Sequence, residues 1–437
     1  PEENLALCLF TADRVSGKSV STARVFACDK TTLTSSKHND LLLPVSGESD
    51  GKLRRLCRAA RAKNAFFVTE NDDVCRAYRL SWSDLTAATT DSVQARKGEH
   101  FLTGLSDGPY ACVISYQDAK KEGRHFRVYS LNEEGRLELH DFPVPAVFED
   151  DFDDIFKKSY HSLSPEKGMR PLAVQYNMEH DPESAARYPK LFIGEDMVWL
   201  AYDAEVKGGY EILKLYTFDL TKDSVWLKRY DYGSGAVQTR GKGSSYIYDG
   251  KIFQLSSSPS HLQIAVRDLW TGNILRFQHH GIDDSLNFAN SPVLIPGRGT
   301  FGIEKEYADL KKFIRRYKSF SPSLQVRRYK EDYVLCIGGY ERIQTGGAMR
   351  MNPATGVWTG GTGFSYERVC AFYTALNAKN LFHSNTYFQR TLASYYAEME
   401  KAFDGVTDEA ILHISGSHYL GRYLTDRDVY TLQKIGE

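Results

Sequence analysis

Basic and aromatic residues alternate between Lys305 and Lys330, and this stretch is the part of the sequence best suited to binding. Cations interleaved with stacking side chains are what an anionic partner, including a nucleic acid, requires. The aromatic residues also recur at helical spacing, which is typical of the buried face of an amphipathic helix. Both interpretations stay open at this point. The candidate binding residues are Lys311, Lys312, Arg315, Arg316, Arg327 and Arg328.

Two other polar clusters resemble metal ligands in residue type but not in spacing. The acidic run EDDFDD at 149–154 has carboxylates of the kind that hard cations prefer, but it lacks the spacing and central glycine of a calcium loop. A solvated charged face is its simpler interpretation. His279 and His280 are adjacent on a predicted strand and therefore point to opposite faces, which prevents them from sharing one metal ion. We expect no metal site.

No motif for a catalytic nucleophile is present. The sequence has no G-x-S-x-G elbow and no P-loop, and TGGTG at 359–363 is typical of a turn. Scattered carboxylates could pair for glycosidase chemistry, but that depends on a separation in space. We therefore predict no catalytic residue and no cofactor, while the question of enzyme activity stays open.

The composition restricts the class of protein. The 437 residues carry a formal net charge of -1, with 42% hydrophobic and 25% charged residues, which is ordinary globular usage. A protein that coats nucleic acid with its whole surface is normally basic, so nucleic acid binding is expected only locally, at the basic stretch. Aromatic residues make up 13% and favour strands. No run of 18 apolar residues exists, so we expect no membrane-spanning helix.

The elements that must position these residues follow from a recurring turn motif. A strand-like run ends at Asp, Asn or Ser, a turn follows, and a second strand begins. The motif occurs at Asp29, Ser81, Asn132, Asp219, Asp268, Asn352 and Asp426. These positions lie 52, 51, 87, 49, 84 and 74 residues apart. A base spacing of about 50 matches one four-stranded propeller blade. The sequence therefore predicts an all-β protein: a single β-propeller domain, residues 1–437, with about seven four-stranded blades.

The longer gaps predict insertions at about 148–184, 302–323 and 386–403, of which the second and third have helical periodicity. Apolar runs before the turns are predicted as inner strands. They are 65–69, 111–116, 197–202, 245–254 and 333–339. Closure of the ring is predicted by pairing of the terminal strands near 5–10 and 429–434, because closure protects sheet edges.

One segment, Tyr333 to Trp358, resembles a kelch blade. An apolar run leads to Gly338-Gly339, and Asn352-Pro353-Ala354-Thr355-Gly356 leads to Trp358. The resemblance implies that the diglycine ends an inner strand and lets neighbouring backbones approach, and that the tryptophan packs between blades. The segment VRDLWTGNIL at 266–275 likewise resembles blades of several other propeller families.

Seven cysteines without a CxxC pair argue against a disulfide framework or a thiolate zinc site. Six of them lie in apolar strand-like runs and are expected to be buried and unpaired. Unpaired thiols fit a cytoplasmic location slightly better than an oxidising compartment, while a periplasmic or cell-surface location stays open. The start at Pro1 fits either a removed signal segment or a trimmed methionine.

The absence of catalytic motifs favours a non-catalytic binding or scaffolding propeller that engages a protein partner through its loops and insertions. The alternative is an exported carbohydrate-binding protein, or a hydrolase or lyase, that acts at the central cavity. Clustered carboxylates at the axis would favour the alternative.

Overall fold

The computed structural model describes most of the chain, with the terminal strands described by their backbone. The described residues are 4–15, 18–29, 35–42, 54–60, 64–71, 73–81, 87–119, 123–157, 171–174, 180, 185–186, 189–206, 210–232, 242–295, 305–306, 309–345, 350–351, 358–359, 364–388, 409–414, 417–424 and 429–436. All statements below concern these residues.

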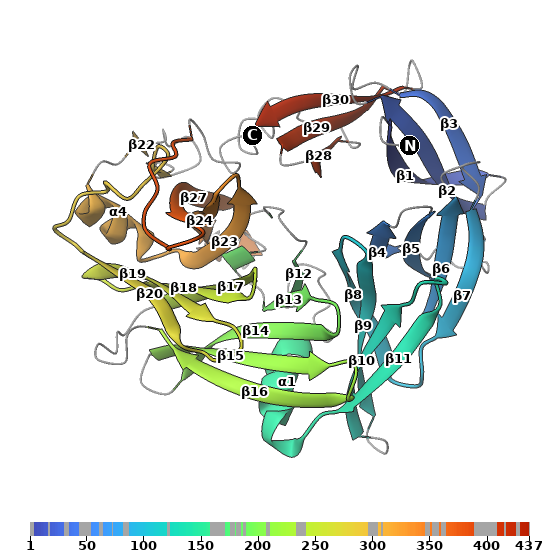
Figure 1. Ribbon diagram of the computed structural model, residues 1–437, viewed down its shortest axis with the longest axis horizontal. Coiled ribbons are helices and arrows are strands. Elements are labelled where there is room, and N and C mark those ends of the chain that lie inside the picture. The colour runs from blue at the N-terminus through green and yellow to red at the C-terminus, as the bar shows by residue number, and fades with distance from the viewer. Residues whose placement is uncertain are drawn as a thin grey trace.

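The described residues form seven sheets of three to five strands, which follow one another around a ring (Figure 1). Sheet 1 contains β1 (Asn4–Val15), β2 (Lys18–Asp29) and β3 (Ser35–Leu42). Sheet 2 contains β4 (Arg54–Ala60), β5 (Asn64–Asn71), β6 (Val74–Ser81) and β7 (Ala87–Gln94). Sheet 3 contains β8 (Glu99–Asp107), β9 (Tyr110–Ala119), β10 (Gly123–Leu131) and β11 (Leu137–Pro143).

The second half continues the same pattern. Sheet 4 contains β12 (Leu172–Ala173), β13 (Lys190–Ile193), β14 (Met197–Val206), β15 (Tyr210–Asp219) and β16 (Ser224–Asp231). Sheet 5 contains β17 (Lys242–Tyr248), β18 (Lys251–Ser257), β19 (His261–Asp268) and β20 (Ile274–Gly281). Sheet 6 contains β21 (Leu294–Ile295), β22 (Lys305–Glu306), β23 (Ser321–Tyr329), β24 (Asp332–Thr345) and β27 (Phe364–Asn377). Sheet 7 contains β28 (Glu409–Ile414), β29 (Ser417–Leu424) and β30 (Val429–Gly436).

This arrangement confirms the predicted all-β propeller. The strand pairs are antiparallel except for β12 with β13. The count of seven blades stays a prediction, since sheets 1 and 7 have three strands each in the described part. The treatment of residues 1–437 as one domain likewise stays a prediction.

The recurring motif forms the turns that its residue types predict. Asn132, Asp219 and Asp268 each follow or end the next-to-last strand of a sheet, which is β10, β15 and β19 respectively. The Oδ1 of Asn132 accepts the N–H of Arg136 at 2.9 Å, and the Oδ1 of Asp268 accepts the N–H of Thr271 at 2.7 Å. Hydrogen bonds of this kind lower the pKa of the Asp219 and Asp268 carboxyl groups. The motif positions Asn352 and Asp426 lie outside the described residues.

Four of the predicted inner strands are instead the strands that follow the inner ones in the chain: β5, β9, β14 and β24. The inner positions belong to β4, β8, β13, β17 and β23, with β12 added inside β13, and β8 contacts both β4 and β13 while β17 contacts β23. Residues 245–254, predicted as one strand, are the β17–β18 hairpin. Asp249 and Gly250 both have positive φ, at 48° and 66°, which is the backbone of a two-residue hairpin turn.

The predicted pairing of the terminal strands is wrong. Strand β1 lies next to β2 alone and β30 lies next to β29 alone, so sheets 1 and 7 are separate among the described strands. The two sheets are neighbours nonetheless, because β3 contacts β30. Figure 1 shows the two chain ends in this part of the ring.

Apolar side chains fill the spaces between adjacent sheets. One cluster joins sheets 2 and 3, a second joins sheets 3 and 4, and a third joins sheets 4, 5 and 6. Phe126 of β10 stacks on Phe218 of β15 at 4.2 Å between ring centroids. The high aromatic content therefore stabilises contacts between blades, since aromatic side chains bury the largest apolar areas.

Two predicted insertions contain helices. Between sheets 3 and 4 the chain forms three consecutive short helical turns, η1 (Ala146–Phe148), α1 (Glu149–Phe152) and η2 (Asp153–Lys157). Between sheets 5 and 6 it forms α4 (Leu310–Tyr317), which begins at Asp309. Within the third insertion, residues 389–403 lie outside the described residues.

The described cysteines agree with the prediction of unpaired, buried thiols. They are Cys57, Cys75, Cys112, Cys336 and Cys370. Burial raises the pKa of Cys57 to about 12 and that of Cys112 well above its ordinary value. These thiols therefore stay protonated and lack the thiolate that acts as a nucleophile. The side chains of Cys8 and Cys28 lie outside the described part.

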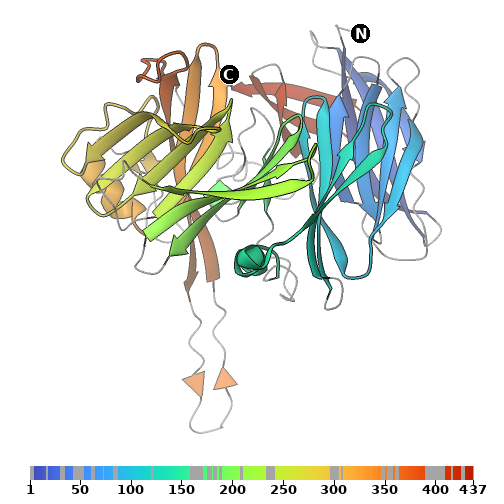
Figure 2. The same ribbon diagram turned by 60° about the horizontal axis from the view of Figure 1, so that its bottom comes forward.

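The diglycine of the kelch-like segment lies in the middle of a long strand rather than at its end. Strand β24 continues to Thr345 and pairs with β27 along its whole length. The short strands β25 (Arg350–Met351) and β26 (Trp358–Thr359) lie beyond this hairpin, away from the ring (Figure 2). A Cβ at Gly338 would lie 2.5 Å from the carbonyl oxygen of Cys370. The backbone of the neighbouring strand therefore approaches Gly338 closely, as the resemblance implies.

Gly339 makes room for α4, and its replacement is expected to destabilise the fold. A Cβ there would lie 2.8 Å from the Tyr317 ring and 2.9 Å from the Cβ of Phe320. We expect Gly339→Ala to lower the free energy of unfolding by about 1–3 kcal/mol, measured by urea denaturation, because overpacking forces these groups apart. Gly281→Ala is the control, since its nearest contact is 3.7 Å. Equal effects of both substitutions would contradict the explanation.

Candidate functional site

Three of the candidate cations lie on the outer face of α4. Asp309 caps the helix by accepting the N–H of Lys311 at 2.8 Å, and the opposite helical face is buried. The Nζ of Lys311 lies 3.0 Å from a carboxylate oxygen of Asp283, while Lys312 and Arg315 are exposed. Arg316 belongs to the same helix, and its side chain lies outside the described part. The aromatic residues at helical spacing are thus the buried face of the helix.

The other two candidates lie at the far end of β23. Six residues of extended chain separate Ser321 from Arg327, which is about 20 Å at the usual rise of a strand. Arg327 is only 4% exposed, and its guanidinium lies 5.4 Å from the ring centroid of Tyr373. Arg328 is half-buried and lies 5.1 Å from the ring of Tyr333. The structure therefore places Lys311, Lys312 and Arg315 on a helix surface and buries Arg327 among aromatic rings.

The acidic run at 149–154 is not a purely solvated face. Arg124 of β10 pairs with Glu149 and, at 3.0 Å, with Asp153. Lys214 of β15 lies 2.6 Å from Asp151. These ion pairs hold the helical turns against sheets 3 and 4, so the face is solvated only in part: the Glu149 side chain is 43% exposed and that of Asp151 only 16%. Coulomb attraction is stronger at such partly buried positions than in water.

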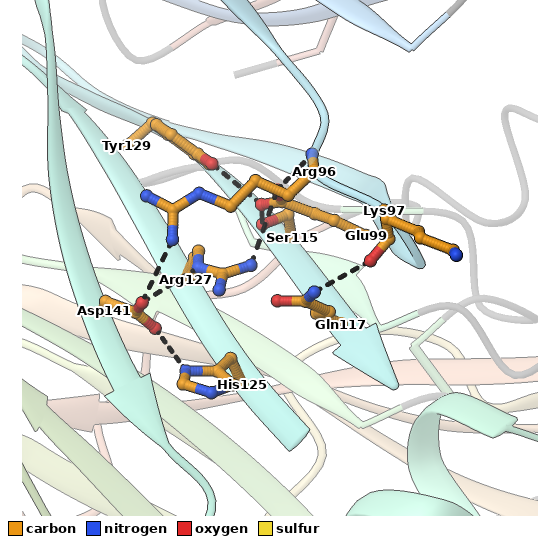
Figure 3. A network of polar contacts seen from close by, with 9 residues as sticks. All are labelled: Arg96, Lys97, Glu99, Ser115, Gln117, His125, Arg127, Tyr129 and Asp141. Carbon is orange, nitrogen blue, oxygen red and sulfur yellow. Dashed lines mark hydrogen bonds and ion pairs between the residues drawn. The ribbon is translucent and has the colours of Figure 1, made fainter. Parts of the chain in front are cut away.

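A buried carboxylate organises the polar side chains of sheet 3 (Figure 3). Glu99, at the start of β8, is 2% exposed. It accepts the hydroxyl of Ser115 at 2.5 Å, the hydroxyl of Tyr129 at 2.8 Å and the N–H of Arg96 at 2.8 Å. Burial and the bond to Glu99 raise the pKa of Tyr129, so this phenol stays protonated. The guanidinium of Arg127 lies 3.4 Å from Glu99.

The network continues toward the surface through Asp141 of β11. Its carboxylate lies 3.2 Å from Nε of Arg127 and 2.7 Å from Nδ1 of His125. Gln117 donates to the carbonyl oxygen of Lys97 at 2.8 Å. In Figure 3 these side chains point toward one another across four strands. The arrangement stabilises the ends of the four strands. Its serine, Ser115, donates its hydroxyl to the buried carboxylate of Glu99.

A second buried network joins sheets 4 and 5 near the inside of the ring. Lys190 of β13 is 2% exposed, and its Nζ lies 3.2 Å from the hydroxyl of Ser244 and 3.6 Å from Asp203. Burial lowers the pKa of Lys190. A lysine beside a serine hydroxyl is a pair that some hydrolases use. Here the hydroxyl oxygen also accepts the N–H of Leu324 at 3.1 Å, and both side chains are shut off from solvent. Lys190 and Ser244 therefore connect sheets 4, 5 and 6.

The first insertion returns along the inner side of the ring. Strand β12 pairs in parallel with β13 and lies inside it in Figure 1. It also contacts β8 of sheet 3. His180, six residues beyond Val174, is hydrogen-bonded through its backbone to Gln325 of sheet 6. Residues 171–174 thus contact sheets 3 and 4, and His180 contacts sheet 6.

Exposed apolar side chains gather on the outer rim of sheet 5. Trp270 is 54% exposed, Ile274 40%, Leu275 47% and Phe382 54%. The first three belong to the β19–β20 hairpin, and Phe382 contacts the same hairpin through Arg276, whose guanidinium lies 4.2 Å from its ring. We call these four residues the rim patch. Large exposed apolar side chains that lie together are typical of contact sites.

Candidate metal ligands do not converge. The described residues contain no group of three or more His, Cys, Asp or Glu side chains placed to hold a metal ion. The His279 ring is tilted against that of His261 with 4.9 Å between centroids, and His280 stacks on Phe288 at 3.9 Å, so the predicted opposite orientation is confirmed. Over the described ranges, no helix is both long enough and apolar enough to cross a membrane.

The spacing of residues along the sequence did not predict the two buried networks. Glu99, Ser115, Arg127 and Asp141 belong to four different strands and meet only through their register. The available signal was a charged or polar residue inside an otherwise apolar strand, as for Arg127 in RVYSL. Lys190 and Ser244 are 54 positions apart and meet across two sheets.

Comparisons with known proteins give the chain no family. No family profile matches it, and no curated protein matches it. Among solved structures, it is similar to the Dos1 propeller, with a TM-score of 0.33 at 12% identity over 85% of this chain and 90% of that one. The WD40 domain of SCAP from fission yeast matches at 0.31, with 8% identity over 83% of each chain.

A third similar structure is dipeptidyl peptidase 4 of Porphyromonas gingivalis, with a TM-score of 0.31 at 10% identity. The match covers 75% of this chain and 36% of the peptidase chain, so this chain spans well under half of that protein. The propeller assignment stands on the sheets of the chain itself.

Proposed function

We propose that this protein is a non-catalytic binding or scaffolding propeller that engages a protein partner through the outer rim of sheet 5. The observation that carries the proposal is the rim patch. Trp270, Ile274, Leu275 and Phe382 are all large, apolar and 40–54% exposed. Tryptophan and phenylalanine at such a surface are the residue types that dominate protein–protein contacts.

One cation lies beside the rim patch and others lie at the far end of β20, and together they indicate the chemistry of an extended partner segment. Arg276 is the cation beside the rim patch, and α4 follows the other end of β20, linked by the ion pair of Lys311 with Asp283. Lys312 and Arg315 are exposed on that helix. A protein segment with apolar side chains and carboxylates complements this surface. The separation of Arg327 and Arg328 from α4 argues against a nucleic acid, which needs cations along a continuous path.

Two observations favour this proposal over a hydrolase, lyase or carbohydrate-binding protein that acts at the axis. The buried Glu99 and Lys190 are engaged with neighbouring side chains rather than directed at a shared cavity. Strand β12 and His180 occupy part of the inner side of the ring. Glycosidase chemistry needs two carboxyl groups that face one substrate.

The test is capture of partners by chemical cross-linking, followed by quantitative mass spectrometry. We expect Trp270→Ala with Leu275→Ser to lower recovery of the partner by about tenfold or more, as loss of a central contact residue does. Val147→Ser is the matched control, because Val147 is 76% exposed elsewhere on the surface. Melting curves of all variants establish that they fold.

Two results would contradict the proposal. One is a set of partners that the rim variant leaves unchanged. The other is turnover of glycoside or peptide substrates that the rim variant retains, which would favour the axial alternative.

A further inference from the structure

Strand β12 is an extended segment added to the inner edge of a sheet. Leu172 and Ala173 pair in parallel with Lys190 and Leu191 of β13. The N–H of Leu172 donates to the carbonyl oxygen of Pro189 at 2.7 Å, and the N–H of Val174 donates to that of Leu191 at 2.9 Å. Backbone pairing of this kind is how extended peptides bind to exposed sheet edges.

The side chains of this segment alternate between two apolar clusters. Leu172 and Val174 pack into the cluster of sheets 4, 5 and 6, where Val174 is 5% exposed. Ala173 packs against the cluster of sheets 3 and 4. This period of two is what a strand requires, and it provides one apolar site for every second side chain.

Gln325 holds the same segment farther along by its backbone. Its Oε1 accepts the N–H of His180 at 2.6 Å, and its Nε2 donates to the carbonyl oxygen of His180 at 3.0 Å. A carboxamide carries both a donor and an acceptor, so it replaces the backbone of a neighbouring strand. Gln325 is only 2% exposed, and its contact engages the backbone of the segment without contacting its side chain.

We propose that the inner edge of β13 together with Gln325 is a peptide-binding edge, which the chain fills with its own residues 171–174 and 180. The partner that it fits is an extended protein segment with apolar residues at alternate positions, which takes this edge when the chain's own segment leaves it. This site goes beyond the rim patch and does not depend on it.

The experiment uses a labelled peptide of residues 171–180 and the full-length protein. In the wild type, the attached segment competes at an effective concentration of about 1 mM, so the peptide binds poorly at micromolar concentrations. Leu172→Pro with Val174→Pro removes both N–H donors of the attached segment. We expect this variant to bind the peptide at least tenfold more tightly than the wild type.

The matched control is the same peptide with proline at the positions of Leu172 and Val174, which is expected not to bind. Equal affinity of the variant and the wild type for the unaltered peptide would overturn the proposal, provided that the variant melts cooperatively. A control peptide that binds as well as the unaltered peptide would overturn it too.

A second measurement on the wild type decides the matter if the proline variant does not fold. Hydrogen exchange of the Leu172, Val174 and His180 amides is followed while unlabelled peptide is added to about 1 mM, the range of the attached segment. The proposal predicts that the exchange of these three amides becomes several-fold faster, with no change for the proline peptide. Exchange that the unaltered peptide leaves unchanged would overturn the proposal.

Discussion

Glu99→Ala is expected to lower the free energy of unfolding by about 3–5 kcal/mol, the usual cost of removing one partner of a buried ion pair. The substitution deprives the Ser115 and Tyr129 hydroxyls of their acceptor inside the protein. It also leaves the buried guanidinium of Arg127 with Asp141 as its remaining carboxylate at 3.2 Å. Urea denaturation followed by circular dichroism measures the change.

The double variant Glu99→Leu with Arg127→Leu distinguishes the charge effect from simple loss of packing. Both charges are then absent, and replacement of a buried ion pair by apolar residues is often close to neutral. We therefore expect the double variant to be more stable than Glu99→Ala. Glu133→Ala, at an exposed position of the same sheet, is expected to change the stability by less than about 0.5 kcal/mol. A double variant less stable than the single one would contradict the explanation.

Phe126→Ala is the second substitution with a large expected effect, a loss of about 3–5 kcal/mol in the free energy of unfolding. Phe126 is fully buried where sheet 3, sheet 4 and the helical turns meet. Its ring centroid lies 4.2 Å from that of Phe218, 6.0 Å from that of Phe152 and 5.9 Å from that of Phe156. The cavity left by the ring would lose contacts to both sheets at once.

The measurement is again urea denaturation, with Val147→Ala as control because this residue of the same helical region is 76% exposed. Phe126→Leu keeps most of the buried volume and is expected to cost less than Phe126→Ala. If Phe126→Ala cost no more than the control, the ring stack would not be the contact that joins sheets 3 and 4.

The fold was predictable from the sequence where local chemistry decides it. Asn132, Asp219 and Asp268 end strands because their side chains hydrogen-bond to the next turn, and this requires no knowledge of the rest of the chain. The first strands of sheets 2 and 3 were missed, because segments such as RRLCRAA at 54–60 pack at the inner side of the ring and show no clear apolar alternation. The Asp249-Gly250 turn was a local signal that the prediction overlooked.

The candidate site was predictable to a smaller extent. Helical spacing correctly placed Lys311, Lys312 and Arg315 on the outer face of a helix. Sequence proximity also suggested that Arg327 belongs with them, but the strand carries it away and buries it among aromatic rings. The rim patch and the peptide edge unite residues from separate strands and loops. Their assembly depends on the register of sheets, which composition does not encode.

The bond between His180 and Gln325 has a consequence for how the protein forms during translation. The two residues are 145 positions apart, which at about 5–20 residues per second corresponds to roughly 7–30 s of synthesis. The hairpins of sheets 2 to 5 involve near neighbours in sequence and can form as the chain leaves the ribosome. The end of the inner segment at His180 cannot be fixed until sheet 6 has been made. Leu172 and Ala173 precede β13 and can pair with it as soon as both strands have been made, so during synthesis the segment is held at β13 before it is held at His180.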